Sequence, residues 1–395
     1  MSEGYPSPTP STARRLPIVR STVAVVLVVL LAVPVLWWRF TPARPVGVVV
    51  VDKTLPFPQW REHERVHWWL DHRRVMDPRG GVAWRVESDY VGYDPVARRG
   101  TDLDSTHLAA ARLVYIADAY GVYSGDYRVA ADSTAAPDNA PSALLYGGMH
   151  DAEVDALERF VARGGSVVAE FNTLEDPTAG TTAGDRLGRL LGVRFDRWLG
   201  RWYGDLSAES EIPPWMKAQY ERIYWKPWAF RGPGLVVFSG VDDRMVVIDS
   251  SEFAARWPVT LEVDDARDPL TRGVRGGQPY WYWFSGVTPT DSGRTLAHFR
   301  LHVSDAAQAR LRAMGFATTL PAVVRHRGPG MRAYLAGDFA DVGTAPPPLR
   351  RTRGTDWLGR LQSRSGKPGR QQRFFWRVTI PLWDGMLDEV RRPRP

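Results

Sequence analysis

The chain has 395 residues, which is long enough for one large domain or two domains of ordinary size. Its net charge is +7, but twelve basic and four acidic residues lie between Arg350 and the C-terminus, so the rest of the chain is nearly neutral. A nearly neutral body argues against nucleic-acid binding, and the lack of cysteine excludes disulfides, thiolate metal ligands and a cysteine nucleophile.

The first 40 residues predict a membrane anchor. Residues 1–20 are rich in Pro, Ser and Thr and contain three arginines, and residues 21–38 follow without a charge. Such a run is close to the shortest length that spans a bilayer, and Trp37-Trp38-Arg39 is typical of a helix end at the membrane interface. We therefore expect a cytoplasmic segment at 1–20, one transmembrane helix at 21–38 and a large extracytoplasmic domain on a single-pass protein of the cell membrane. A cleaved signal peptide and a buried helix of a soluble protein are the alternatives.

Residues 44–194 predict an α/β domain, because short apolar runs alternate with helical patterns. The clearest unit is 142–172, in which a Gly147-Gly148 turn leads into a helix and Gly164-Gly165 end it before the next apolar run. This alternation is typical of a parallel sheet with flanking helices. We expect the buried strands at 46–51, 82–86, 113–117, 142–146 and 167–169.

The second half of the chain has a different texture. Residues 195–343 predict a β-rich region, rich in Trp and Tyr, that returns to the α/β sheet near its end, and a hairpin is expected where 235–238 and 245–248 flank a turn. Residues 344–395 are a basic, Pro- and Arg-rich tail in which apolar content returns from Phe374. Stacking on sugar rings and packing in a core or interface are both open for the aromatic residues Trp198, Trp202, Tyr203, Trp281, Tyr282 and Trp283.

Polar side chains follow each expected strand of the α/β domain. In open parallel sheets, ligands bind beyond the carboxyl ends of the strands, so these side chains together predict a ligand-binding crevice. Solvation or capping of a turn is the alternative for any single one of them. The set expected at this edge is Asp52, Lys53, Asp89, Tyr90, Asp118, His150, Glu170 and Asn172, with Glu62 and His63 on the helix after the first strand.

The order of a Gly-Gly strand end, an Ala-Leu-x-x-Phe-Val helix, Gly-Gly and a buried strand resembles class I glutamine amidotransferase-like domains. The resemblance covers about 46–193 and extends to 320–340, including Leu187 to Val193 and Gly330 to Phe339. It implies an α/β fold in which active members have a nucleophilic Cys on a Gly-flanked elbow after the fifth strand. Here that place is taken by Glu170-Phe171-Asn172, so the resemblance does not imply amidotransferase chemistry.

Three functions are compatible with these residues. The leading hypothesis is a membrane-anchored binding or scaffold protein in cell-envelope polysaccharide handling, whose partners are the membrane and either a polysaccharide or a membrane protein, without nucleic acid, cofactor or metal. The second is a hydrolase that cleaves a glycan with Glu170 and a further carboxylate, Asp52 or Asp89. The third is a zinc hydrolase, because His63-Glu64-x-x-His67 places two imidazoles and a carboxylate on one helical face.

Overall fold

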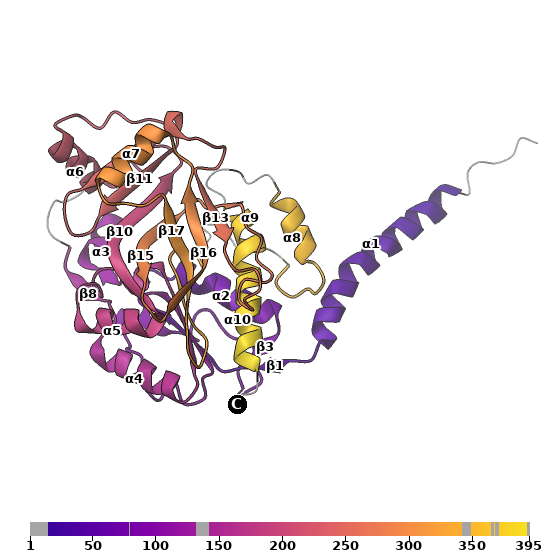
Figure 1. Cartoon of the computed structure of the whole chain (residues 1–395). Helices are drawn as coiled ribbons and strands as arrows, with labels where there is room; N and C mark the ends of the chain where they lie inside the picture. The colour runs from indigo at the N-terminus through magenta and orange to yellow at the C-terminus, as the bar shows by residue number, and fades with distance from the viewer. Residues whose placement is uncertain are drawn as a thin grey trace, which may run out of the picture.

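The computed structural model describes residues 15–78, 80–131, 142–341, 349–364, 367 and 371–392. A long helix, α1 (Arg15–Phe40), projects from the main body of the protein (Figure 1). The helix expected at 21–38 lies within α1, whereas residues 1–14 of the expected N-terminal segment lie outside the described residues. In the described part of the chain, no helix combines the length and hydropathy that crossing a membrane requires.

The body is built on a mixed sheet of ten strands. Its centre, β18-β9-β6-β2-β4, is parallel, and the strands from β14 to β17 extend it as an antiparallel meander. The parallel strands are runs of Val, Ile and Ala that are buried on both faces, as expected for strands covered by helices on each side. In spatial order the strands are β14 (Gln278–Pro279), β13 (Val259–Val263), β16 (Gly293–Leu301), β17 (Thr319–His326), β18 (Arg332–Leu335), β9 (Ser166–Glu170), β6 (Leu113–Asp118), β2 (Val48–Asp52), β4 (Val91–Asp94) and β5 (Arg99–Gly100).

A second, antiparallel sheet has four strands, and two short strand pairs complete the β-structure. The predicted hairpin is confirmed as β11 and β12 of this sheet. The sheet contains β12 (Met245–Asp249), β11 (Gly234–Ser239), β10 (Val193–Tyr203) and β15 (Trp283–Pro289), and the pairs are β1 (Arg44–Pro45) with β3 (Val75–Met76) and β7 (Val122–Tyr123) with β8 (Leu144–Tyr146).

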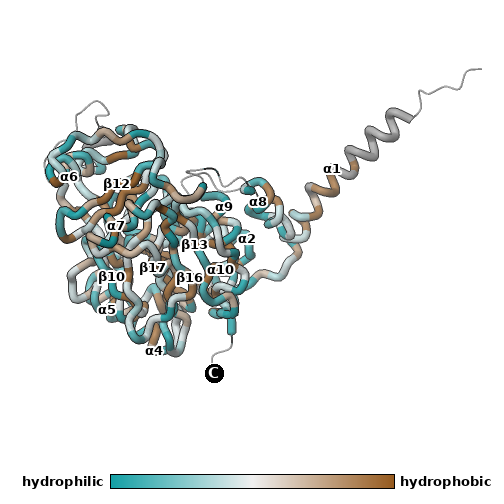
Figure 2. The backbone as a smooth tube through the Cα atoms, turned by 45° about the horizontal axis from the view of Figure 1, so that its top comes forward, coloured by the Kyte–Doolittle hydropathy of each residue, from teal (hydrophilic) through white to brown (hydrophobic). Residues whose placement is uncertain are grey.

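Helices cover both faces of the large sheet (Figure 1). Successive strand residues point to opposite faces, so Tyr115 packs in the core beneath α2 and α10, whereas Val114 and Ile116 pack in the core beneath α4 and α5. Figure 2 shows the apolar strands enclosed within a more polar surface. Besides α1, the helices are α2 (Arg61–His72), α3 (Ser124–Ala131), α4 (Asp151–Ala162), α5 (Thr182–Leu191), α6 (Pro214–Tyr224), α7 (Asp305–Ala313), α8 (Asp356–Gln362), α9 (Gln372–Phe374) and α10 (Ile380–Arg391), with short helical turns η2 (Phe171–Thr173), η3 (Ser250–Glu252) and η4 (Phe375–Thr379).

The C-terminal segment, expected as part of a basic tail, packs against the sheet. Phe374, Trp376 and Trp383 are buried, and Trp383 lies against Trp69 of α2 with ring centroids 5.3 Å apart. The Trp383 indole N–H donates to the Tyr115 hydroxyl at 2.9 Å. Apolar side chains that recur at helical spacing after Phe374 give α10 a face that covers the sheet, and this outweighs the basic composition of the segment.

Two of the expected parallel strands are wrong. Residues 82–86 form no strand beyond an isolated bridge at Ala83, and the strand beside β2 is β4 instead. Residues 144–146 form β8, which pairs only with β7, and Leu144 and Leu145 are exposed. Short apolar runs do not by themselves distinguish a central strand from a peripheral one. The helix expected after Gly147-Gly148 is confirmed as α4, which ends at Ala162. Gly164 follows with a φ of +85°, a conformation that glycine adopts without strain, and turns the chain towards β9.

Candidate functional site

Asp52 and His63, from β2 and α2, form a buried pair at the carboxyl edge of the sheet. The His63 Nδ1–H donates to Asp52 Oδ2 at 2.6 Å, and His63 Nε2 lies 2.9 Å from the Val86 carbonyl oxygen. The other Asp52 oxygen accepts the Thr54 backbone N–H at 2.9 Å. Both side chains are fully buried, so this pair joins β2 to α2 and faces no open space.

Asp118, at the end of β6, is the centre of a second buried cluster. Its oxygens accept hydrogen bonds from the Thr54 hydroxyl at 2.5 Å, the Tyr120 backbone at 2.7 Å and the Asn172 amide at 2.7 Å. Burial, followed by the nearby charge of Asp52, raises the pKa of Asp118 to about 6. The structure thus brings together Asp52, Asp118 and Asn172 as expected, but it buries the two acids.

Glu170, at the end of β9, is held by hydrogen bonds on both oxygens. Oε2 accepts the backbone N–H groups of Phe339 and Ala340, each at 3.0 Å, and Oε1 accepts the Tyr115 hydroxyl. Burial raises the pKa of Glu170 to about 8, against the opposing effect of these hydrogen bonds. This is the arrangement of a carboxyl group that fixes a loop, which disfavours Glu170 as the acid of a hydrolase.

Lys53 and His150 also have structural partners. The fully buried Lys53 ammonium donates to Glu153 at 2.7 Å, to the Gly148 carbonyl at 2.7 Å and to Asp102 at 3.2 Å. His150 is exposed and begins α4, where its backbone N–H donates to Glu153 at 2.9 Å. Asp102, His150 and Glu153 lie close enough to hold a metal ion, but the Lys53 ammonium already pairs with Asp102 and Glu153.

Asp89 and Tyr90 do not follow a strand, because the strand expected at 82–86 is absent. Asp89 lies before β4 and accepts the Arg85 backbone N–H at 2.6 Å, so it closes a turn. The Tyr90 hydroxyl donates to the Tyr93 carbonyl at 2.9 Å, and its ring lies 4.6 Å from that of His63. Neither residue shares with Glu170 any of the cavities found among the described residues.

The contacts of the two histidine rings of the HExxH pair, His63 and His67, argue against the zinc hypothesis. Both ring nitrogens of His67 lie 3.2 Å from backbone carbonyl oxygens, those of His63 and Asp89. Burial, followed by the charge of His63, lowers the pKa of His67 to about 3. With the ring nitrogens of His63 engaged by Asp52 and Val86, the HExxH pair offers no imidazole that points into open space.

Glu62 belongs to a different acidic group, with Asp338 and Asp341 beyond β18. Arg61 pairs with Asp341 Oδ2 at 2.8 Å, and the Tyr282 hydroxyl donates to the same oxygen at 2.6 Å. Burial, followed by the charge of Asp341, raises the pKa of Glu62 and of Asp338 well above the usual range. Arg61 thus pairs with Asp341, while burial favours the protonated forms of Glu62 and Asp338.

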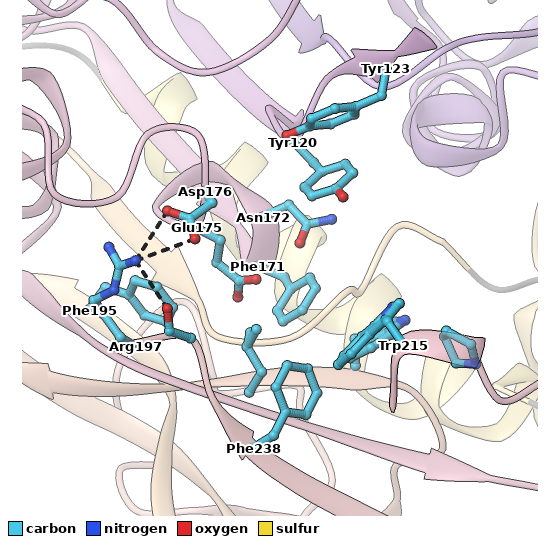
Figure 3. A pocket seen from close by; sticks show the side chains of 14 residues that line it. Tyr120, Tyr123, Phe171, Asn172, Glu175, Asp176, Phe195, Arg197, Trp215 and Phe238 are labelled. Carbon is cyan, nitrogen blue, oxygen red and sulfur yellow. Dashed lines mark hydrogen bonds and ion pairs between the residues drawn. The ribbon is translucent and has the colours of Figure 1, made fainter. Parts of the chain in front are cut away.

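The open cavity at this edge lies beside these buried groups, between the end of β9 and the second sheet. We call it the aromatic pocket; its volume is about 490 Å³. Figure 3 shows its side chains converging from the segments that follow β6 and β9, from the second sheet and from the start of α6. It is lined by Tyr120, Tyr123, Phe171, Asn172, Glu175, Asp176, Phe195, Arg197, Leu199, Pro213, Trp215, Phe238, Gly240 and Trp283.

Aromatic rings form most of the wall. Phe171 stacks on Trp283 with centroids 6.0 Å apart, and the two rings are inclined by 26°. Trp215 meets Phe238 edge to face at 5.3 Å, and 48% of its surface is exposed. The wall therefore offers flat apolar surfaces at several angles, at least one of them accessible from solvent.

Glu175 is the unusual polar group of the aromatic pocket. It is only 6% exposed, and its Oε1 has no hydrogen-bond partner among the described residues. Burial, followed by the charges of Asp118 and Asp176, raises the pKa of Glu175 well above its usual range, which favours the protonated form of the carboxyl group. Figure 3 shows this group beside Phe171 and Asn172. A buried, unpaired carboxyl group is costly to the fold, and a ligand hydroxyl would supply the missing partner.

Sequence reasoning reached only part of this pocket. Asn172 was expected at the strand-end crevice, and Trp283 was one of the aromatic residues for which both sugar stacking and core packing were open. Trp202, Tyr203 and Trp281 are core residues. Glu175 and Asp176 were missed, although they follow the end of β9 by a few residues and so carried the same strand-end signal as Glu170. Arg197 and Phe238 had no signal in the sequence, because they reach the site from the second sheet.

Comparisons with known proteins give only distant likenesses. No family model matches the chain, and no curated protein matches it. A ThuA-like protein from Parabacteroides merdae ATCC 43184 aligns with a TM-score of 0.40 and 12% identity over 88% of this chain and 91% of its own, and one from Bacteroides uniformis ATCC 8492 aligns with 0.37 and 12% over 79% and 89%. A glutamine amidotransferase from Thermotoga maritima aligns with a TM-score of 0.35 and 9% identity over 88% of this chain and 99% of its own.

Proposed function

We propose that the protein binds a carbohydrate in the aromatic pocket, as a membrane-anchored binding or scaffold protein of the cell envelope. The observation that carries this proposal is an unpaired carboxyl group, Glu175, buried in the wall of a cavity lined by aromatic rings. Sugar rings present apolar C–H faces to aromatic side chains and hydroxyls to polar ones. Phe171 and Trp215 supply the first kind of surface, while Glu175 and Asn172 supply the second.

Binding without turnover fits the site better than hydrolysis does. Glycoside cleavage needs two available carboxyl groups on opposite sides of the scissile bond. Glu170 is engaged on both oxygens, and Asp176 adjoins Glu175 in the chain and pairs with Arg197, so in the described part of the chain Glu175 is the one lining carboxyl group without an ionic partner. We further propose that the domain is a glutamine amidotransferase-like domain without the nucleophilic Cys. Where active members of that family have the Cys, after the fifth strand, this chain has Glu170-Phe171-Asn172.

Helix α1 motivates the membrane part of the proposal. Several of its described apolar side chains are exposed: Val28 is 65% exposed and Phe40 is 79% exposed. Apolar surface of this extent is stable when lipid covers it. We propose that α1 anchors the protein, with the body on the extracytoplasmic side.

Trp215 gives the direct test of carbohydrate binding. We expect a panel of envelope glycans to contain members that quench tryptophan fluorescence, and Trp215→Ala to weaken their binding about tenfold, since a stacked ring contributes roughly 1 kcal/mol or more. The matched control is Trp225→Ala, because Trp225 is 90% exposed and lies outside the pocket. A panel without a single binder, or equal losses in both variants, would contradict the proposal.

A further inference from the structure

A second hollow adjoins the aromatic pocket. Its volume is about 330 Å³, and it lies between α5, the start of β10 and the loop that follows η2. Phe195 and Arg197 line both hollows, so the two form one continuous binding surface. The second hollow differs in character, because Arg189, Arg194 and Arg197 line it with Asp185 as the single acidic lining residue.

Arg197 reaches both hollows because of an irregularity in β10. The pairing of β10 with β15 shifts register between Phe195 and Trp198, which is a β-bulge, and Arg197 sits there with a φ of +60°. A residue other than glycine rarely adopts this backbone conformation, since its Cβ crowds the backbone. Bulges and strained residues of this kind often direct a side chain into a functional site.

The present contacts of Arg197 are weak. Its Nη2 lies 3.3 Å from each oxygen of Asp176 and 3.3 Å from the Gly240 carbonyl oxygen (Figure 3). Asp176 is exposed, and an ion pair open to solvent contributes little to stability. On the side of the second hollow, Gly180 has no side chain and so leaves room for Nη1 of Arg197. A Cβ atom on residue 180 would lie 3.4 Å from that nitrogen. The guanidinium therefore retains donors that can bind an anion.

We propose that the ligand is an acidic oligosaccharide whose anionic substituent, a carboxylate, sulfate or phosphate, is bound by Arg197. One sugar ring occupies the aromatic pocket, and the charged group of the adjacent sugar enters the second hollow. A planar guanidinium forms paired hydrogen bonds with such oxygens, and Arg189 and Arg194 add positive charge around them. This inference rests on the proposed carbohydrate binding and adds the class of sugar.

The test compares hexuronic-acid oligosaccharides with the same oligosaccharides after their carboxyl groups have been reduced to neutral alcohols. Titration calorimetry on the full chain should give at least tenfold tighter binding of an acidic member, and the difference should shrink as salt rises. Arg197→Gln should remove most of that difference. Arg222→Gln is the control, because Arg222 is another arginine in an ion pair with an aspartate, is more exposed than Arg197 and lines neither hollow.

The outcomes separate the two proposals. Equal binding of acidic and neutral partners, unaffected by Arg197→Gln, would overturn the acidic-ligand inference and leave carbohydrate binding intact. Failure of every oligosaccharide to bind would overturn both. Should Arg197→Gln lower the melting temperature, Arg197→Gly provides the same loss of charge in a residue suited to this backbone conformation, and it must also abolish the preference.

Discussion

Glu175 shows how one side chain can link a binding site to the pH response of the fold. Its carboxyl group is buried, lacks a partner on one oxygen and lies near the charges of Asp118 and Asp176. A carboxyl group whose pKa is raised in the folded protein keeps its proton to a higher pH there than it does in the unfolded chain. The folded protein therefore binds more protons than the unfolded chain above about pH 4.5, and the contribution of Glu175 to stability falls as pH rises towards its raised pKa.

Replacing Glu175 with Gln should remove this contribution, because an amide has similar size and no charge. We expect Glu175→Gln to be more stable than the parent at pH 8 and the difference to become smaller towards pH 5, with about 1.4 kcal/mol for each unit by which the folded pKa exceeds the unfolded one. Chemical unfolding at several pH values measures this. Glu209→Gln, at an exposed position, is the control, and parallel pH curves for parent and Glu175→Gln would refute the assignment.

At the scale of elements, α10 is the clearest departure from the sequence-based expectation. Its face packs on the sheet through Trp383, which contacts Trp69 and donates a hydrogen bond to Tyr115. Tyr115 in turn donates to Glu170, so one chain of hydrogen bonds joins α10, β6 and β9. A helix connected in this way belongs to the core.

Trp383→Ala should therefore destabilise the protein by about 3–5 kcal/mol, the usual cost of removing a buried Trp. Trp357→Ala is the matched control, because Trp357 is exposed on α8 in the same segment and should change stability by less than about 0.5 kcal/mol. Thermal and urea unfolding give both values. If Trp383→Ala were as stable as the parent, the segment would be a dispensable tail after all.

The sequence predicted those elements that local chemistry defines. The helix α4, the glycine that ends it and the strand β9 follow from apolar spacing and turn residues alone. By contrast, Leu144 and Leu145 carry the same apolar signal as a central strand, and only pairing with β7 places them at the surface. The position of Glu170 was predictable, but the amides of Phe339 and Ala340 that occupy it lie almost half the chain away. Contacts of that kind have no local signature.

On the scale of the whole molecule, α1 and the body are joined firmly. The Trp38 indole donates to the Asp71 carbonyl at 3.0 Å, Arg74 donates to the Trp38 carbonyl at 3.0 Å, and the Arg353 backbone N–H donates to the Pro34 carbonyl at 3.0 Å. The end of α2 with the turn that follows it, and the segment before α8, thus hold the end of the helix. If α1 is an anchor, the body has one fixed orientation relative to the membrane surface.

The anchor can be tested with charges placed in α1. We expect the full chain to remain with membranes after alkaline carbonate extraction and Val28→Arg/Val29→Arg to release it, because each arginine in a bilayer costs about 2.5–3.5 kcal/mol. Val241→Arg, at an exposed turn between β11 and β12, should leave membrane retention unchanged. Release of the unmodified protein by carbonate would exclude the anchor.

The contribution of the C-terminal residues to the central core has a consequence for biosynthesis. β18, which pairs with β9, and α10, which covers the sheet, are synthesised long after β9. The emerging polypeptide consequently lacks the partners that would close its central layer until both segments have been made. During that interval the apolar strands of the nascent chain are exposed, and chaperones are needed to cover them.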